Sequence, residues 1–445
     1  MTGMPAAQAL VFAISVIAVI AAIRARFHPF LVLTIVASAF GLIVGLSVGL
    51  IGKAFGNGFS EALNLPGLVI VAMVLVAGIA EQTGTTGSLA TVGRRPWLGS
   101  SDWMMAIVGL VAGIGASPAA ALALLNPLLQ GGGEKSRRER NATRAALAIS
   151  AGHGLIWLSP VPIAAAAILG AGWQRVAMFG VPVAFVSTAI GIGWAHLVSP
   201  PQSAISDPSG LKDKSGIGSA AVLLAACFIP LLMLMTQSVG DMPSEPFGGG
   251  AHRELILGIG RPLVLFLVSV CIITLGHWRL TLKFMRDSEW TGRILGKAAG
   301  IILTVGAAGG LQRLCQQTGM AELLGERLST WHVAGAAGVL IPFLVAAVIK
   351  TLQGSSLVAA ITTAGMMQPL LSPLGFDSDS GIALAALAVG AGAMMISHVN
   401  DDFFWLVSYV TEVSPPRTLG TFSVATLLQG CAAAMLLLLF AAFGV

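Results

Sequence analysis

The strongest chemical signal in the chain is a short polar segment near its C-terminal end. Residues 397–402 read Ser-His-Val-Asn-Asp-Asp and lie between two apolar runs, 381–396 and 403–410. Polar groups at bilayer depth are costly, and they usually face a cavity that serves a transport pathway. A histidine or carboxylate in such a cavity can bind and release a proton as its surroundings change. We therefore predict that His398 and Asp401 couple a proton to transport.

A second polar interruption lies about fifty residues earlier. Lys350 precedes Gly354, Ser355 and Ser356 in an otherwise apolar region, and Ser117 occupies a comparable Gly-Ala-Ser-Pro break in the first half. Broken helices expose backbone N–H groups at their N-termini, and these groups bind anions well. We predict an anion cradle built from both breaks. The alternative is helix packing, since small and hydroxylated residues are common at helix–helix interfaces in membranes.

A third interruption contains His153, Gly154 and Ser159, with prolines at 160 and 162. Two prolines cannot continue a regular helix, and irregular backbone at membrane depth is tolerated inside protein or along a cavity. We expect Gly154 and Ser159 to contact a substrate, and His153 and Asn400 to bind its hydroxyl groups. The simpler interpretations are a satisfied buried histidine for His153 and a water-facing helix end for Asp402.

The composition indicates the medium in which these segments lie. Of 445 residues 56% are hydrophobic and only 10% are charged, with a mean hydropathy of +0.88. Several apolar runs reach the ~20 residues that cross a hydrocarbon core, and their length argues against a closed barrel. The sequence predicts an all-α polytopic membrane protein. The net charge of +5 is then explained by membrane topology and not by nucleic-acid binding. Lys and Arg cluster in short loops such as 135–144, as they do in the cytoplasmic loops of membrane proteins.

Two halves of the chain share landmarks in the same order. Gln82-Thr83-Gly84 recurs as Gln317-Thr318-Gly319, and Asn126-Pro127-Leu128-Leu129 recurs as Gln368-Pro369-Leu370-Leu371. A shared order of weak matches indicates an internal duplication.

The charge rule orients the two halves. With the N-terminus outside, spans over 5–23, 29–51 and 67–80, a re-entrant hairpin over 103–129 and two later crossings return the chain to the inside. Five crossings are an odd number, so the second half must run upside down, as in many secondary transporters. We predict two inverted-topology repeats, each with a re-entrant hairpin and a broken helix. Their bounds are 1–198 and 218–445, joined by a cytoplasmic linker over 199–217.

One apparent enzyme motif is interpreted as packing. Residues 45–49 match the Gly-x-Ser-x-Gly hydrolase pattern, but they lie within the predicted span 29–51 and not on a strand-to-helix turn. A phosphate-loop motif is missing from the sequence, which argues against ATP-driven transport by this chain.

The three polar interruptions together resemble those of the gluconate permease (GntP) family, part of the ion transporter superfamily. The residues that carry the resemblance are Ser397-His398-Val399-Asn400-Asp401 with Phe404-Trp405-Leu406, Gln353-Gly354-Ser355-Ser356-Leu357-Val358-Ala359, and His153-Gly154 with Pro160 and Pro162. The resemblance implies a proton-coupled importer of sugar acids such as gluconate in a bacterial cytoplasmic membrane. It also implies a homodimer with a scaffold and a mobile part, and a site lined by His153, Gly354, Ser355, His398, Asn400 and Asp401.

This chain departs from the family pattern at three places. Near the first hairpin the family often has an aromatic-acidic pair, where this chain reads Ala116-Ser117-Pro118-Ala119. Trp157-Leu158-Ser159 stands where the family has more prolines and a histidine, and Lys350 stands where it often has arginine. A lysine makes a bidentate carboxylate clamp there less favourable, so a smaller or less hydroxylated acid is a plausible substrate.

The functional prediction is therefore a symporter that moves a small organic acid with protons across the lipid bilayer. It uses no cofactor besides the coupling proton, no metal and no nucleic acid. The carboxylate of the substrate would bind to the hairpin N–H groups and to Ser117, Lys350, Ser355 and Ser356. The alternatives are an integral-membrane enzyme that uses His153, His398 and Asp401, an organic-anion antiporter, and a passive channel.

Overall fold

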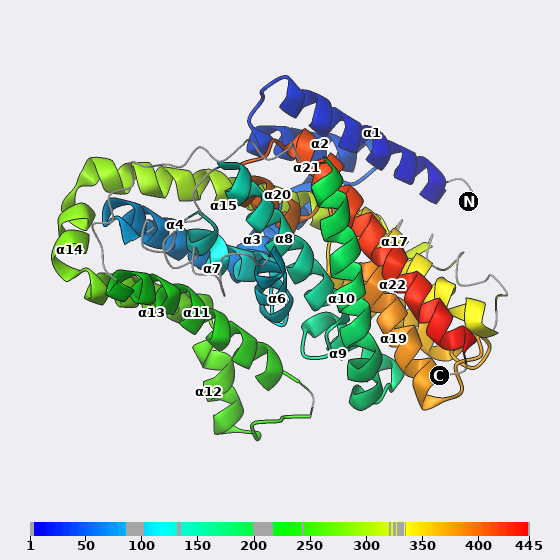
Figure 1. Cartoon of the computed structure of the whole chain (residues 1–445). Helices are drawn as coiled ribbons and strands as arrows, with labels where there is room; N and C mark the ends of the chain where they lie inside the picture. The colour runs from blue at the N-terminus through cyan, green and yellow to red at the C-terminus, as the bar shows by residue number, and fades with distance from the viewer. Residues whose placement is uncertain are drawn as a thin grey trace.

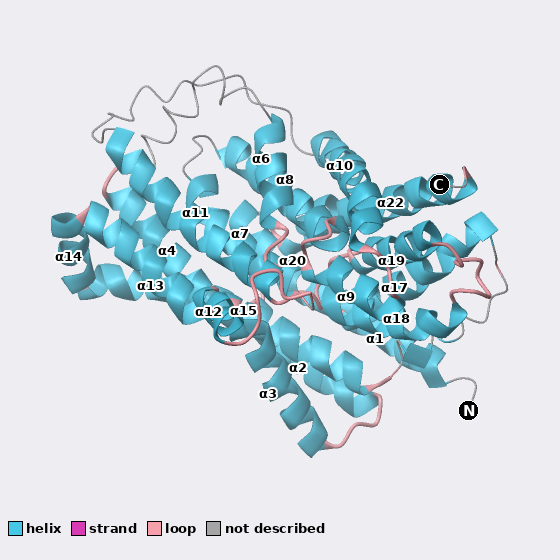
Figure 2. Ribbon diagram, turned by 90° about the horizontal axis from the view of Figure 1, so that it is seen from below, coloured by secondary structure: helices cyan, strands magenta, loops and turns pink. Residues whose placement is uncertain are grey.

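The computed structural model describes residues 4–85, 102–130, 135–198, 217–242, 244–319, 322–323, 326, 333 and 335–443. Within these ranges the protein is built from helices and their connections, without strands, which confirms the all-α prediction (Figure 2). The predicted linker 199–217 lies almost entirely outside the described residues.

The helices of the first half are α1 (Met4–Arg24), α2 (Pro29–Ile43), α3 (Val48–Asn64), α4 (Pro66–Gln82), α6 (Asp102–Ala112), α7 (Pro118–Gln130), α8 (Lys135–Leu155), α9 (Pro160–Leu169) and α10 (Trp173–Val198). Those of the second half are α11 (Ile217–Gly240), α12 (Ala251–Ile259), α13 (Pro262–Gly276), α14 (Trp278–Arg286), α15 (Ser288–Gln317), α17 (Leu340–Gln353), α18 (Ser356–Met367), α19 (Asp379–Ala393), α20 (Asp402–Thr411), α21 (Pro415–Thr418) and α22 (Val424–Ala442). Short 3-10 turns occupy Gly335–Val339 and Gln368–Leu370, and a π-helical turn, Leu419–Ser423, leads into α22.

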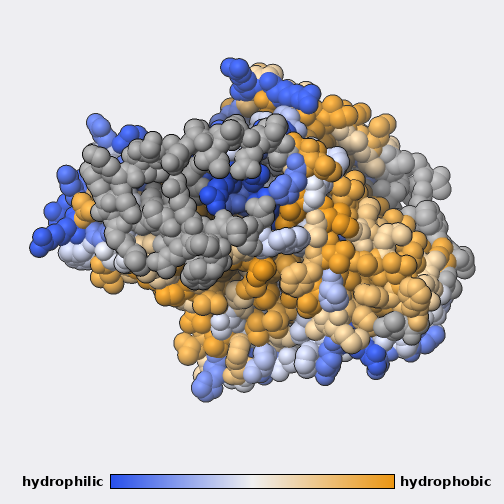
Figure 3. All heavy atoms as spheres, in the orientation of Figure 1, coloured by the Kyte–Doolittle hydropathy of each residue, from blue (hydrophilic) through white to orange (hydrophobic). Residues whose placement is uncertain are grey.

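Seven helices among the described residues are long and apolar enough to cross a membrane. Two further pairs pass the same test together, although each is bent: α3 with α4 by 49° and α12 with α13 by 55°. Apolar residues cover much of the lower and right part of the face shown in Figure 3, and hydrophilic residues lie along its rim and in one inner patch left of the centre. These features identify an integral membrane protein with several spans.

The predicted span over 29–51 is wrong. Helix α2 ends at Ile43, the chain turns at Gly45 with a φ of 87°, and Ser47 accepts the Leu50 amide at 3.3 Å to begin α3. Only glycine adopts such a φ without cost, and serine is a preferred first cap of a helix. A hydropathy window sees neither signal, because the residues on both sides are apolar.

The helices pack into two groups, and each group draws on both halves of the chain. The first group is α1–α4 with α11–α15, in which α3 lies along α15 and α4 along α13. The second group is α6, α8–α10, α17–α19 and α22. Of these, α9, α10, α17, α19 and α22 lie side by side at the right of Figure 1. Helices α7 and α20 contact both groups. The groups therefore meet where the broken helices lie.

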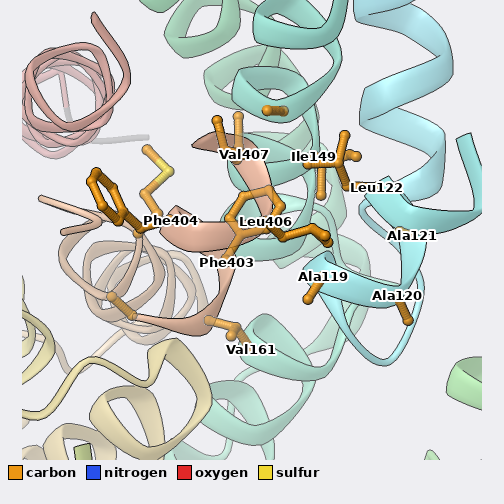
Figure 4. Close-up of a cluster of buried hydrophobic side chains, with 14 of the residues drawn as sticks. Ala119, Ala120, Ala121, Leu122, Ile149, Val161, Phe403, Phe404, Leu406 and Val407 are labelled. Carbon is orange, nitrogen blue, oxygen red and sulfur yellow. The ribbon is translucent and has the colours of Figure 1, made fainter. Parts of the chain in front are cut away.

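Packing within the second group repeats itself between the halves. Helix α6 lies along α8 as α17 lies along α19, and α8 contacts α10 as α19 contacts α22. The remaining short helices pack against the opposite half of the chain: α18 of the second half packs on α9 of the first, and α7 of the first half packs on α20 of the second. In Figure 4 the side chains of α20 face those of α7 and α8, with Leu406 and Val407 near Leu122 and Ile149.

Glycines allow the closest helix approaches. A Cβ added at Gly154 of α8 would meet the Gly390 carbonyl of α19, and a Cβ at Gly390 would meet the Gly154 carbonyl. Gly58 of α3 and Gly309 of α15 are in the same mutual relation within the first group. Small residues let helix backbones touch in this way.

Candidate functional site

A cavity of about 410 Å³ opens at the junction of the two helix groups. Helices α3 and α15 form one side of it, and the ends of α7, α8, α17, α18 and α20 form the other. Its polar lining residues are Glu61, Ser117, Ser150, His153, Gln312, Arg313, Gln316, Lys350, Ser355, Ser356, Ser397, Asp401 and Asp402. Cavities of about 300–1,000 Å³ hold small ligands, so this one can take a single small organic molecule.

The break between α17 and α18 presents backbone donors to the cavity. Gly354 ends α17 with a φ of 85°, and an added Cβ there would meet the Asn400 carbonyl. Ser355 then caps α18 by accepting the Val358 amide at 3.3 Å, and its own carbonyl accepts the Ala359 amide.

Two amides at the start of α18 remain available. Among the described residues Ser356 and Leu357 have no backbone or side-chain acceptor for their N–H groups, and both residues line the cavity. Orphan N–H groups at a helix N-terminus form a ready anion site. The sequence predicted this break, and the structure places Gly354, Ser355 and Ser356 on the cavity wall.

A buried ion pair joins this break to the second broken helix. The Lys350 ammonium donates to Asp401 Oδ2 at 2.6 Å and to the Gly354 carbonyl. Ser397 Oγ donates to the same Asp401 oxygen at 2.5 Å, and the Phe403 amide donates to Oδ1 at 3.0 Å. The side chains of Lys350 and Asp401 are 2% and 6% exposed. Asp401 therefore carries a fixed negative charge that caps α20 and neutralises Lys350.

Asp402 lines the same cavity and is half-buried. Its Oδ1 accepts the Phe403 amide at 2.9 Å, and its carboxyl group lies within hydrogen-bonding reach of that of Asp401. Of these two adjacent carboxyl groups, Asp401 is the one that pairs with Lys350.

The first half contributes His153, Gly154 and Ser117 to the wall. His153 Nδ1 donates to the Gly113 carbonyl at 3.3 Å, which leaves Nε2 as an acceptor in the neutral ring. Ser117 accepts the Ala120 amide at 3.2 Å as the cap of α7. The next residue, Pro118, has no N–H to offer, so the start of α7 is a poorer anion site than the start of α18.

Three predicted site residues lie behind the lining. His398 Nε2 donates to the Thr351 carbonyl at 2.8 Å, and Asn400 Nδ2 donates to the same carbonyl at 3.0 Å. Ser159 Oγ donates to the His153 carbonyl at 2.6 Å. Each therefore satisfies the last carbonyls of a broken helix, Thr351 in α17 or His153 in α8. The structure gives them a positioning role at the breaks.

The wall opposite the breaks contains residues that the sequence analysis missed. Arg313 of α15 lines the cavity, donates to Gln316 Oε1 at 2.9 Å and lies 3.9 Å from Glu61 of α3. An arginine inside a long apolar helix is itself a signal of function, and α15 runs apolar from 298 to 311 before it. That signal was available and would have identified this side of the site.

The arrangement suits an anion that also carries hydroxyl groups. A cation and unpaired amides can hold a carboxylate, while serine, glutamine and the free His153 nitrogen can pair with hydroxyls. The Lys350 charge is already balanced by Asp401.

The chain matches the model of the GntP family permease over residues 7–443. It is 29% identical over 434 residues to a gluconate permease of Pseudomonas aeruginosa, covering 94% of this chain and 93% of that one. It is 26% identical over 436 residues to the D-serine transporter DsdX of Escherichia coli K12, covering 94% of both chains. A low-affinity gluconate transporter of the same strain is 24% identical over 429 residues, with 93% of each covered.

Two solved structures align with the chain, each at a TM-score below 0.5. MtrF of Neisseria gonorrhoeae, described as illuminating a class of antimetabolite efflux pumps, aligns with a TM-score of 0.38 and 15% identity over 93% of this chain and 95% of its own. The YdaH transporter of Alcanivorax borkumensis aligns with a TM-score of 0.42 and 16% identity over 94% and 99%.

Proposed function

Because the chain belongs to the GntP permease family, we propose that it imports a small hydroxylated organic anion, such as gluconate, together with protons. Its curated relatives are permeases and transporters, so the protein is a transporter and the enzyme alternative is set aside. The relatives named for gluconate and for D-serine handle molecules that share a carboxylate and at least one hydroxyl group. This shared chemistry defines the substrate class.

The observation that carries the proposal is the free N-terminus of α18 at the cavity. The amides of Ser356 and Leu357 would receive the substrate carboxylate, because among the described residues they have no acceptor of their own. Such donors are fixed by the backbone and by the Ser355 cap, so little reorganisation accompanies binding.

Arg313 would face the same anion from the opposite helix group. A guanidinium gives charge-assisted hydrogen bonds to a carboxylate. Arg313 lies 3.9 Å from Glu61, so its guanidinium can exchange this long contact for one with the substrate carboxylate. Ser117, Gln316 and His153 Nε2 would contact the hydroxyl groups.

Transport across the membrane would use the division into two helix groups. We propose that the halves are inverted repeats and that the second helix group, α6, α8–α10, α17–α19 and α22, moves relative to α3 and α15. The repeated packing of α6 on α8 and α17 on α19 supports this proposal. Movement of one group against the other would carry a substrate held at the break of α17 and α18 past the Arg313 wall.

Uptake of radiolabelled gluconate into proteoliposomes tests the function. We expect an imposed inward proton gradient to drive accumulation, and a proton ionophore to abolish it. Lack of uptake across a panel of sugar acids and hydroxy acids would contradict the substrate class. Uptake that needs an internal counter-anion and ignores the proton gradient would favour an antiporter.

The family resemblance further supports a homodimer in the bacterial inner membrane. Cross-linking of native membranes tests this assembly, since a monomer band alone would contradict it.

A further inference from the structure

Asp402 is a cavity carboxylate that forms no salt bridge with a described lysine, arginine or histidine. Every salt bridge recorded among the described residues involves another carboxylate, including those of Lys350 with Asp401 and of Arg313 with Glu61. One Asp402 oxygen is held by the Phe403 amide. The second has no donor from any lysine, arginine or histidine within the described residues, and the residue borders the cavity.

We propose that Asp402 binds the co-transported proton, a role that rests on the proposed function of this cavity as an anion transport site. The sequence analysis assigned this role to Asp401 and His398. The geometry points to the neighbouring carboxyl group instead.

The balance of charge around the cavity supports this assignment. The charged groups on its wall are Arg313 of α15, Lys350 of α17, Glu61 of α3, and Asp401 and Asp402 of α20. Carboxylates exceed cations by one even before an anionic substrate enters. Like charges in a confined site disfavour each other's ionised form. A proton on Asp402 therefore removes the one excess negative charge of the cavity wall. A bound substrate anion adds a further negative charge and so favours protonation of Asp402 more strongly.

Asp401 is poorly suited to bind the same proton. Its two oxygens accept hydrogen bonds from Lys350, Ser397 and the Phe403 amide, and donors of this kind favour the ionised carboxylate. Neutralising it would leave the Lys350 ammonium buried without a counter-charge, which is strongly unfavourable.

His153 is the other titratable group on the wall, contributed by α8. The Nδ1–H group of His153 donates to the Gly113 carbonyl. The variant His153→Gln therefore serves as a control in the infrared test below. His398 does not line the cavity and packs against the Phe12 ring, with centroids 6.0 Å apart.

Proton and substrate binding should then strengthen each other, since coupling between two sites is reciprocal. In the pH range where Asp402 loses its proton, the gluconate affinity of the native chain should fall by up to about tenfold per pH unit. The Asp402→Asn variant mimics the protonated residue, so its gluconate affinity should stay nearly constant over the same range.

The first test needs no substrate. Infrared difference spectra of the purified chain, recorded while the pH is raised, should contain the band of a buried protonated carboxyl group that disappears. The band should be missing in Asp402→Asn and present in Glu61→Gln and in His153→Gln. A band that persists in Asp402→Asn would overturn the assignment.

The second test uses gluconate in proteoliposomes. Asp402→Asn should exchange internal for external gluconate but lose accumulation driven by a proton gradient, whereas Asp402→Glu should keep some accumulation and so control for folding. Gradient-driven accumulation by Asp402→Asn at the native level would overturn the inference. A native chain that ignores gluconate while showing the Asp402 band would instead refute the proposed function and leave the proton site standing.

Discussion

Lys350 and Asp401 form a buried ion pair, with the lysine Nζ 2.6 Å from Oδ2 of the aspartate. The two residues are 51 positions apart in the chain, and the pair joins the break after α17 to the start of α20. The same ammonium also donates to the Gly354 carbonyl. One cation thus fixes two irregular segments relative to each other.

Removing either partner should destabilise the protein. Because a single substitution leaves the other charge buried and unpaired, Lys350→Met and Asp401→Asn should each lower the free energy of unfolding by about 3–5 kcal/mol. Thermal unfolding of the detergent-solubilised chain would measure this. The double variant Lys350→Met/Asp401→Asn should lose much less than the sum of the two single losses, and additive losses would show that the pair does not act as a unit.

Gly354→Ala should disrupt the break between α17 and α18. The φ of 85° costs an L-residue about 1–2 kcal/mol, and the new methyl group would also meet the Asn400 carbonyl. We expect lower thermal stability and loss of gluconate uptake. Gly365→Ala in the same hairpin is the matched control, because it is exposed and its Cβ meets nothing within 4 Å. It should leave uptake intact and raise stability slightly, by up to about 1 kcal/mol.

Arg313→Ala should weaken substrate binding. Loss of a charge-assisted hydrogen bond worth about 1.5–3 kcal/mol raises the KM for gluconate roughly tenfold or more. Glu61→Gln should act in the opposite direction, because it removes the carboxylate 3.9 Å from Arg313. Arg253→Ala, which removes a remote ion pair with Asp241, controls for general charge loss. Equal KM values in Arg313→Ala and the native chain would remove Arg313 from the site.

Alanine substitutions at two serine caps, Ser355 and Ser378, can distinguish an effect on substrate binding from an effect on protein stability. Ser355 caps α18 at the cavity, while Ser378 caps α19 on an exposed surface by accepting the Gly381 amide at 3.0 Å. Replacing either by alanine should cost about 1 kcal/mol of stability. Only Ser355→Ala should also raise the KM for gluconate, measured as initial uptake rates. A similar KM change in Ser378→Ala would assign the effect to stability alone.

The local breaks were the predictable part of the site. Glycine, proline and serine interrupt apolar runs at 115–118, 152–162, 353–356 and 397–402, and a helix breaks there for reasons contained in those residues. The structure accordingly brings Ser117, His153, Gly354 and Asp401 to one cavity.

The partners across the site were beyond local reasoning. Arg313 reaches the cavity because Gly58 and Gly309 let α3 and α15 touch, and a sequence pattern does not specify which helices meet. The same limit applies to Asp401, whose pairing with Lys350 depends on how two breaks are packed together. The turn at Gly45 was overlooked because hydropathy averages over it.

The contact of Gly154 with Gly390 has a further consequence for how the molecule works. With carbonyl oxygens where side chains would otherwise stand, α8 and α19 have no compressible layer between them, so neither can tilt or rotate alone. In the proposed movement of the helix groups, the two discontinuous helices would therefore travel as one rigid piece. A bulky residue at either glycine would force the two backbones apart and so block that movement.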